Sequence, residues 1–222
     1  MTEFKLPRFY PLLDTRVLGA LSISPLDAAR AVLDEGAKIL QYRHKATWAQ
    51  SVFDEAAEIA RMSAEAGALF VVNDRVDFAK LLKAAVHIGS DDLSPFAARR
   101  ILGPEPVIGF STHNGFQLKQ ASEEAVQYLA LGPIFSTVTK ENPDPVVGLD
   151  NLEKWRALTD KPVVAIGGIT LERAVDVLRR GADSVAVISG FLPRDHSVRG
   201  LREMARAWVE LTNSVAEGSR VR

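Results

Sequence analysis

The sequence predicts an α/β fold, a single (β/α)8 TIM barrel with parallel strands, and three observations carry this prediction. Short runs rich in β-branched and aliphatic residues recur along the whole chain of 222 residues, and each run is apolar almost throughout. Strands of a parallel sheet that is covered on both faces have this pattern. Segments with helical spacing lie between the runs, and the connections are short, which is typical of βαβ units.

Eight apolar runs are expected to form the strands. In chain order they are Phe9–Leu13, Ile39–Tyr42, Leu69–Val72, Val86–Ile88, Val107–Phe110, Tyr128–Leu131, Val163–Ile166 and Val185–Ile188. Eight strand–helix units in a chain of this length favour a compact closed barrel. A doubly wound open sheet is the alternative, since a strand can be missed or added in such a count.

The helices are expected to begin and end at recognisable residues. Ser24 is a candidate N-cap, Pro25 takes the first helical position, and Gly36 ends that helix. Later in the chain, Thr170 and Gly181 take the same starting and stopping roles. Such helices between strands complete the βαβ pattern.

The composition is that of one globular domain. The chain is 47% hydrophobic and 25% charged, and no shift in composition marks a second domain. There are no cysteines, which excludes disulfides, thiolate nucleophiles and zinc sites built on sulfur. The sequence therefore predicts one domain over residues 1–222, with a polar, frayed tail after about residue 212.

Charge and hydropathy exclude several classes of partner. The formal net charge is −1, so no global field draws the protein to nucleic acid or to an anionic membrane. No apolar run approaches the roughly 20 residues of a transmembrane helix. The first residues, MTEFKLPRFY, lack the apolar segment of a signal peptide. A cytoplasmic protein is expected.

The end of the second predicted strand carries two cations. Active sites of such barrels lie at the carboxyl ends of the strands. In the segment QYRHK, the side chains of Gln41, Arg43 and Lys45 alternate and project to one side of an extended chain. Two cations and an amide at the barrel mouth suit a polyanionic ligand, and an ordinary basic strand end is the alternative.

Carboxylates follow the next two strands. The third strand leads into VVNDRVD, with Asn73 and Asp74, and the fourth into VHIGSDD, with Asp91 and Asp92. Each pair could cap the helix that follows it. Carboxylates at adjacent strand ends also fit Mg²⁺, which is commonly held by one or two carboxylates together with phosphate oxygens.

The remaining strand ends carry hydroxyls, a lysine and glycines. The fifth leads into GFSTHN, and the sixth into LGPIFSTVTK, which ends at Lys140. Gly167 and Gly168 follow the seventh strand, where backbone N–H groups can approach an anion closely. A phosphate site after strands seven and eight recurs in this fold. Solvated loops explain each end separately, whereas a site for two phosphorylated groups explains them together.

The histidines and tryptophans are expected to be mainly structural. His87 lies within a strand and His196 in a polar surface run, whereas His113 lies on the rim and could touch a ligand. The tryptophans are expected in helices that pack on the barrel, and they are Trp48, Trp155 and Trp208.

Taken in chain order, these segments resemble the motifs of the thiamine phosphate synthase family. The segments are QYRHK, VNDRVD, VHIGSDD, GFSTHN, LGPIFSTVTK, AIGGIT and GADSVAVIS, and the similarity runs from about Phe9 to Ser189. It implies a (β/α)8 barrel transferase of thiamine biosynthesis that joins a pyrimidine diphosphate to a thiazole phosphate, or to its carboxylated form, and releases pyrophosphate. It also implies a Mg²⁺-assisted dissociative displacement without a general base, with two phosphorylated small molecules as partners. The oligomeric state is left open.

Position by position, the resemblance implies three groups of site residues. Those implied for the pyrimidine diphosphate are Gln41, Tyr42, Arg43, His44, Lys45, Asn73, Ser111 and Lys140. Those implied for the thiazole phosphate are Thr137, Val138, Thr139, Gly168, Ile188 and Ser189. Asp74 and Asp92 would bind Mg²⁺, and the catalytic residues would be Arg43, Lys45, Ser111 and Lys140.

The sequence departs from the family pattern at several positions. His44 stands where the family commonly has Glu, and Ser90 and Asp91 replace a usual Gln-Glu pair. The segment KAAVH lacks a glycine before its valine. None of these changes removes a charge that the reaction needs, but the shortening affects the loop near Asp92.

Two other functions fit the same barrel. A thiazole tautomerase needs an acid/base residue but no diphosphate or metal machinery, and a non-catalytic phosphate-binding module has no use for metal ligands. The presence of Asp74, Asp92 and Lys140 together argues against the tautomerase, since buried charges without a function are costly. Turnover with both substrates separates the three functions.

Overall fold

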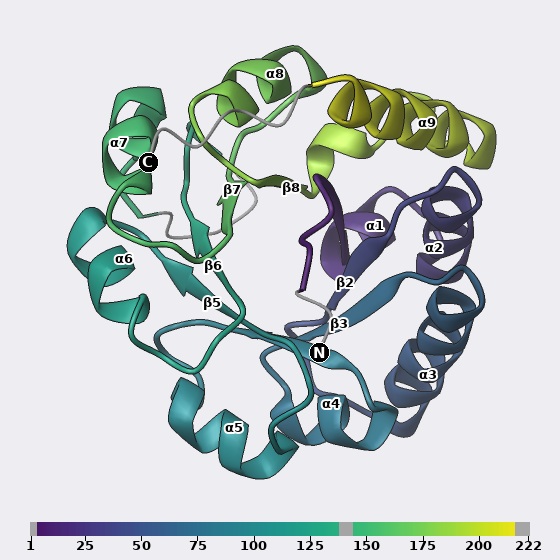
Figure 1. Ribbon diagram of the computed structural model, residues 1–222. Coiled ribbons are helices and arrows are strands. Elements are labelled where there is room, and N and C mark those ends of the chain that lie inside the picture. The colour runs from purple at the N-terminus through teal and green to yellow at the C-terminus, as the bar shows by residue number, and fades with distance from the viewer. Residues whose placement is uncertain (1–3, 138–143, 216–222) are drawn as a thin grey trace.

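The computed structural model of the protein describes residues 4–137 and 144–215, and within these residues eight parallel strands form a closed barrel (Figure 1). The strands are β1 (Phe9–Asp14), β2 (Ile39–Arg43), β3 (Leu69–Asn73), β4 (Ala85–Ile88), β5 (Ile108–Thr112), β6 (Tyr128–Leu131), β7 (Val163–Ile166) and β8 (Ser184–Val187). Each strand pairs in parallel with the next along the chain, and β8 pairs with β1. The predicted barrel is confirmed, and the open sheet is excluded.

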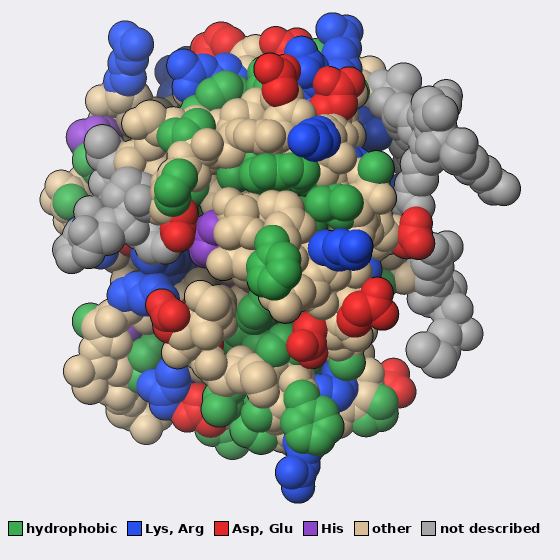
Figure 2. Space-filling view, turned by 90° about the vertical axis from the view of Figure 1, so that its left-hand side faces the viewer, with side chains coloured by type: hydrophobic (Ala, Val, Ile, Leu, Met, Phe, Trp, Pro, Cys, Tyr) green, Lys and Arg blue, Asp and Glu red, His purple; other side chains and the backbone are tan. Residues whose placement is uncertain are grey.

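The helices form a ring outside the barrel (Figure 1). They are α1 (Thr15–Ala20), α2 (Pro25–Asp34), α3 (Gln50–Glu65), α4 (Val76–Leu82), α5 (Pro95–Leu102), α6 (Gly115–Ala121), α7 (Gly148–Arg156), α8 (Leu171–Arg179) and α9 (Val198–Ser214), with a 3-10 turn η1 (Ser189–Phe191) after β8. Charges of both signs are interspersed on the outer face that carries α6 and α7, consistent with the net charge near zero (Figure 2).

Three strands extend one residue further than the sequence predicts, to Asp14, Arg43 and Asn73. The parallel register continues through these residues, because Asp14 pairs with Arg43 and Asn73 pairs with His87. Residues with polar side chains thereby become the last residues of rigid strands. These extra residues all lie at the end of the barrel that holds the cavity described below.

The helix starts follow the predicted capping in part. Ser24 accepts a hydrogen bond from the backbone N–H of Asp27, as expected of an N-cap. Thr170 lies at the N-cap position of α8, but its side chain makes no capping hydrogen bond to the backbone. Asp14, which the sequence analysis did not single out, caps α1 by accepting from the N–H groups of Arg16 and Val17.

The core has two layers. The larger layer lies between the strands and the helices, and the smaller fills the barrel interior. The interior layer consists of Leu6, Tyr10, Leu12, Ile39, Val71, Ala85, Tyr128, Ala130, Val164 and Ala186. Leu6 belongs to the segment before β1, and Phe4 stacks on Tyr128. The amino-terminal end of the barrel is thus filled, and the cavity opens at the carboxyl ends of the strands.

The end of the described chain is helical. Helix α9 continues to Ser214, and Thr212 is buried and bonded to the carbonyl of Trp208. The expected fraying of the tail stays a prediction. The rest of that tail, residues 216–222, lies outside the described residues. Trp48 precedes α3 rather than lying in a helix. Within the described part of the chain, no helix is long and apolar enough to cross a membrane.

Candidate active site

A cavity of about 610 Å³ lies at the carboxyl ends of the strands, and all eight strands contribute to its wall. The residues predicted for the site that line it are Gln41, Arg43, Lys45, Asn73, Asp74, Asp92, Ser111, Thr137, Gly168, Ile188 and Ser189. They come from segments far apart in the sequence. A cavity of this size suits a small-molecule site.

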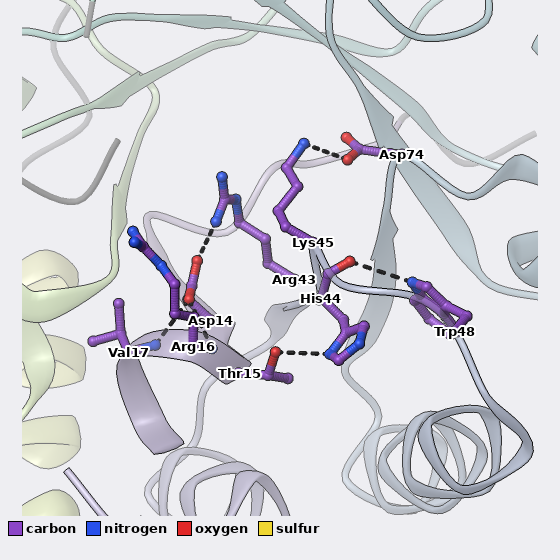
Figure 3. A network of polar contacts seen from close by, with 9 residues as sticks. All are labelled: Asp14, Thr15, Arg16, Val17, Arg43, His44, Lys45, Trp48 and Asp74. Atoms are coloured by element: carbon purple, nitrogen blue, oxygen red, sulfur yellow. Dashed lines mark hydrogen bonds and ion pairs between the residues drawn. The ribbon is translucent and has the colours of Figure 1, made fainter. Parts of the chain in front are cut away.

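The predicted site residues Tyr42 and His44 do not line this cavity. Tyr42 is buried in the outer layer, and its hydroxyl donates to Glu55 of α3 at 2.6 Å. His44 contacts Thr15 through Nδ1 at 2.8 Å and points away from Arg43 (Figure 3). Alternate residues of a strand face opposite sides, so these positions do not support the predicted contact of either side chain with the pyrimidine diphosphate.

Three further residues predicted for the site belong to the segment 138–143. Val138, Thr139 and Lys140 lie outside the described residues. Their predicted roles toward the two phosphorylated substrates stay predictions.

Arg43 is held in place by a buried carboxylate. Its guanidinium pairs with Asp14, whose side chain is almost fully buried (Figure 3). The other carboxylate oxygen of Asp14 accepts the two N–H groups at the start of α1. Because Asp14 is itself fixed by the helix start, the cation of Arg43 has little freedom to reorient. Sequence analysis missed Asp14 because it looked like the end of an apolar strand.

Lys45 and Asp74 form an ion pair at the neighbouring strand end (Figure 3). Asp74 has a left-handed backbone with φ 64°, which is uncommon outside glycine and is most tolerated by Asn and Asp. Burial raises the pKa of the Asp74 carboxyl above its ordinary value, the paired Lys45 opposes this rise, and the neighbouring Asp92 carboxylate adds to it. Two carboxylates therefore share a partly dehydrated space beside a cation.

The carboxylates that follow β3 and β4 are not helix caps. The N-cap position of α4 is Arg75, without a side-chain capping bond, and Ser94 caps α5 by accepting from Ala97. Asp92 instead accepts the N–H of Gly89 at 2.8 Å within its own loop. The capping alternative is therefore excluded for Asp74 and Asp92.

Asn73 leaves a buried donor without a partner. Its side chain is 5% exposed and lines the cavity, and its Nδ2 has no hydrogen-bond partner among the described residues. Buried polar groups are nearly always bonded, and an exception at a cavity wall points to a missing acceptor. A ligand with an acceptor atom beside Asn73 satisfies this group.

Two histidines line the cavity. His87, expected to be structural, reaches the cavity wall and bonds Ser111 through Nε2 at 2.8 Å. Burial lowers the pKa of His87 to about 4, so its ring is neutral at neutral pH. His113 lies on the rim as predicted, with Nδ1 donating to the carbonyl of Gly132 at 2.7 Å. His196 is exposed in a polar turn, as expected.

The opposite side of the cavity is built from glycines. Gly167 and Gly168 have φ of 101° and 63°, and a Cβ on Gly168 would lie 2.4 Å from the carbonyl oxygen of Ser136. Ser189, the first residue of η1, lines the cavity beside them. Exposed backbone N–H groups next to glycines suit a phosphate.

Arg173 is a cavity residue that sequence analysis missed. It lies in the first turn of α8, its guanidinium lies 4.7 Å from the centre of the Phe135 ring, and it donates to the carbonyl of Gly168 at 3.1 Å. The sequence shows that Arg173 follows the predicted N-cap Thr170 by three residues and so belongs to the first turn of this helix. It does not show that this turn lies beside the glycines, which only the fold reveals.

Known proteins match the chain over most of its length. The family model described as thiamine monophosphate synthase matches residues 10–191. The chain belongs to the thiamine monophosphate synthase family. The resemblance stated from the motifs is confirmed.

Two sequence relatives and one solved structure illustrate this membership. A thiamine-phosphate synthase from Koribacter versatilis is 47% identical over 191 residues, which cover 85% of this chain and 90% of that protein. One from Chloroflexus aurantiacus is 39% identical over 84% of this chain and 88% of its own. The structure of thiamine phosphate pyrophosphorylase from Pyrococcus furiosus has a TM-score of 0.81 at 29% identity, covering 94% of this chain and 96% of its own.

Proposed function

We propose that this member of the thiamine monophosphate synthase family condenses 4-amino-2-methyl-5-hydroxymethylpyrimidine diphosphate with 4-methyl-5-(2-phosphoethyl)thiazole, or with its carboxylated form. The products are thiamine phosphate and pyrophosphate, which makes the protein a transferase. The carbon–oxygen bond to pyrophosphate breaks with its electron pair on the leaving group. The lone pair of the thiazole nitrogen then forms the new carbon–nitrogen bond. No proton has to be removed from the reacting nitrogen.

The observation that carries this proposal is a single cavity with two walls that each suit an anion. One wall has the cations Arg43 and Lys45, and the other has Gly168, Ser189 and a third cation. The reaction brings together a diphosphate and a monophosphate, so it needs two anion sites within reach of one another. The comparisons favour the synthase over the thiazole tautomerase, because the matching family and both reported sequence relatives carry the synthase name.

We propose that the cationic wall binds the diphosphate. Arg43 is tied to Asp14 and Lys45 to Asp74, so both cations are oriented before the ligand arrives. Preorganised charges lower the barrier where charge develops, which here is the departing pyrophosphate. Lys140, outside the described residues, is predicted to assist at the same group.

The residues at the β3 and β4 ends fit Mg²⁺, the implied cofactor. Burial raises the pKa of the Asp74 carboxyl, and the nearby Asp92 carboxylate adds to this rise, so a divalent cation held by these two residues would offset both effects. Among the described residues, no group of three or more His, Cys, Asp or Glu side chains could hold a metal, so two carboxylates would share the ion with phosphate oxygens and water. When bound, Mg²⁺ supplies positive charge to the leaving pyrophosphate.

We propose that the glycine wall holds the acceptor. Gly168 and Ser189 would cradle its phosphate, with Thr137 and Ile188 bordering it. Arg173 would add a positive charge that the backbone groups alone lack. Because the acceptor phosphate keeps its charge throughout the reaction, this wall has only to bind and orient.

We further propose that the whole chain acts as one catalytic domain in the cytoplasm on these two small phosphorylated molecules. With a net charge of −1, no field draws it toward nucleic acid or an anionic membrane.

The direct test mixes purified protein with both substrates and Mg²⁺ and follows the products by mass spectrometry. The expected result is thiamine phosphate and pyrophosphate in equal amounts. Absence of thiamine phosphate from folded protein at saturating substrates contradicts the proposal, and conversion of a thiazole carboxylate phosphate to its isomer alone supports the tautomerase.

A further inference from the structure

A chain of hydrogen bonds crosses the barrel interior at the floor of the cavity. Gln41 Nε2 donates to the Tyr10 hydroxyl at 2.9 Å, and the Tyr10 and Tyr128 hydroxyls are 2.9 Å apart. Tyr128 meets His87 Nδ1 at 3.1 Å, and His87 Nε2 meets Ser111 Oγ at 2.8 Å. The chain joins Gln41 to Ser111 through three buried side chains that the reaction chemistry does not use, and of these three Tyr10 and His87 also line the cavity.

The donor at one end fixes the order of hydrogens along the chain. Because Tyr10 accepts from Gln41, its own hydrogen has Tyr128 as its acceptor, and Tyr128 must then donate to His87 Nδ1. The reverse order would leave the Tyr10 hydrogen without an acceptor at a fully buried position, which is costly. The neutral His87 ring then carries its hydrogen on Nε2 and donates it to Ser111 Oγ.

Packing holds Tyr128 in the position that this order needs. Tyr128 pairs in register with Gly109 of β5, and a Cβ on Gly109 would lie 2.0 Å from Cζ of Tyr128. The Tyr128 ring also stacks on His87, with centroids 5.6 Å apart, and meets the Tyr10 ring edge-on at 6.1 Å. The missing side chain of Gly109 is therefore the space that the tyrosine occupies.

We propose that Tyr128 is a positioning residue that sets the tautomer of His87, so that Ser111 receives a hydrogen from His87 and presents its own hydroxyl hydrogen to the ligand. This inference deepens the proposed function. It assigns the ligand atom at Ser111 as a hydrogen-bond acceptor, such as a phosphate oxygen or an unprotonated ring nitrogen. It also means that Ser111 is a donor rather than a base.

The order of hydrogens can be measured without substrates. Protein labelled with ¹⁵N in its histidine rings is examined at neutral pH by long-range ¹H–¹⁵N correlation, and the His87 signals are assigned by their loss in His87→Gln. The expected result is a single neutral tautomer with hydrogen on Nε2. A neutral His87 ring with its hydrogen on Nδ1 overturns the proposal. This measurement is made on the wild-type protein, so it does not depend on the folding of a Tyr128 variant.

Three variants then identify which residue sets the tautomer. Tyr128→Phe removes only the hydroxyl, and His87 is expected to become a mixture of tautomers. Ser111→Ala removes the acceptor beside His87 Nε2. Tyr128 still donates to His87 Nδ1 in this variant, so His87 is expected to keep its hydrogen on Nε2. Tyr42→Phe, which also removes one buried tyrosine hydroxyl but bonds Glu55, is the matched control for the spectrum. A tautomer shift in Ser111→Ala, or an equal shift in Tyr42→Phe, overturns the role of Tyr128.

Steady-state kinetics test the same role, because loss of a purely structural tyrosine would not change the KM of one substrate alone. In Tyr128→Phe, the KM for the pyrimidine diphosphate is expected to rise about threefold to tenfold, as for one weakened hydrogen bond, while the KM for the acceptor stays unchanged. Equal changes in both KM values overturn the proposal. Protein with the Nε2 tautomer but no synthase activity would contradict the proposed function and leave the relay intact.

Discussion

The two walls of the cavity hold anions by different means. The wall at the ends of β2, β3 and β4 contains charged side chains, and each of its two cations is tied to a carboxylate, Arg43 to Asp14 and Lys45 to Asp74. The wall at the ends of β6, β7 and β8 contains glycines, several hydroxyl side chains and one carboxylate, Asp144, with Arg173 as its cation among the described lining residues.

The difference matches what each anion does in the proposed reaction. The diphosphate gains charge at the leaving oxygen as its bond breaks, so interactions that strengthen in the transition state raise turnover. The acceptor phosphate does not change, so a cradle that binds it lowers its KM without accelerating the chemistry. The charged wall should therefore control turnover, and the glycine wall should control acceptor binding.

Removing divalent cations should have the largest effect. If Asp74 and Asp92 hold Mg²⁺ with the diphosphate, exhaustive chelation is expected to abolish turnover, and added Mg²⁺ is expected to restore it. Product formation before and after chelation measures this. Full activity in the chelated protein would contradict the proposal that Asp74 and Asp92 hold a Mg²⁺ ion that turnover requires.

Loss of one cation of the charged wall should rank next. Lys45→Ala is expected to lower kcat by roughly 10² to 10³, as when one preorganised electrostatic group is removed. Lys45 is half exposed, so the fold should hold. Lys154→Ala, an exposed lysine of α7 away from the cavity, is the control. Equal kcat in the two variants would show that Lys45 only solvates its strand end.

Loss of the cation of the glycine wall should be smaller and of a different kind. Arg173→Ala is expected to raise the acceptor KM roughly tenfold, the cost of one charge-assisted hydrogen bond, with kcat retained. Arg179→Ala, on the same helix but outside the cavity lining, is the control. A fall in kcat with an unchanged acceptor KM would assign Arg173 to the diphosphate.

Acid should weaken the folded protein modestly through His87. Burial lowers its pKa from 6.5 to about 4, so between these values the unfolded chain binds a proton that the folded chain does not. The free energy of unfolding should then fall as pH falls through this window, by at most about 1.4 kcal/mol per pH unit. Denaturant unfolding of the wild type and of His87→Gln measures the contribution. Parallel pH profiles of the two proteins would show that His87 titrates normally.

Sequence reasoning predicted the barrel because continuous apolar strands and capped helices alternate in it, a pattern set by neighbouring residues. It also found most cavity residues, since strand ends are visible in the sequence. It missed Asp14, Arg173 and the bond between His87 and Ser111, because these depend on which side chains from distant segments meet. Tyr42 and His44 were included with their whole segment, although strand alternation turns them outward.

The most direct test compares kcat and acceptor KM for one substitution in each wall. Asp74→Asn is expected to lower kcat by roughly 10² to 10³ with little change in acceptor KM. Gly168→Ala is expected to raise the acceptor KM at least about tenfold with kcat retained, because its Cβ would lie 2.4 Å from the carbonyl oxygen of Ser136 and displace the backbone beside the cradle. Gly103→Ala, with φ 87° but nothing within 4 Å, controls for backbone strain. The opposite pattern, with acceptor KM changed by Asp74→Asn and kcat by Gly168→Ala, would contradict the division between the two walls.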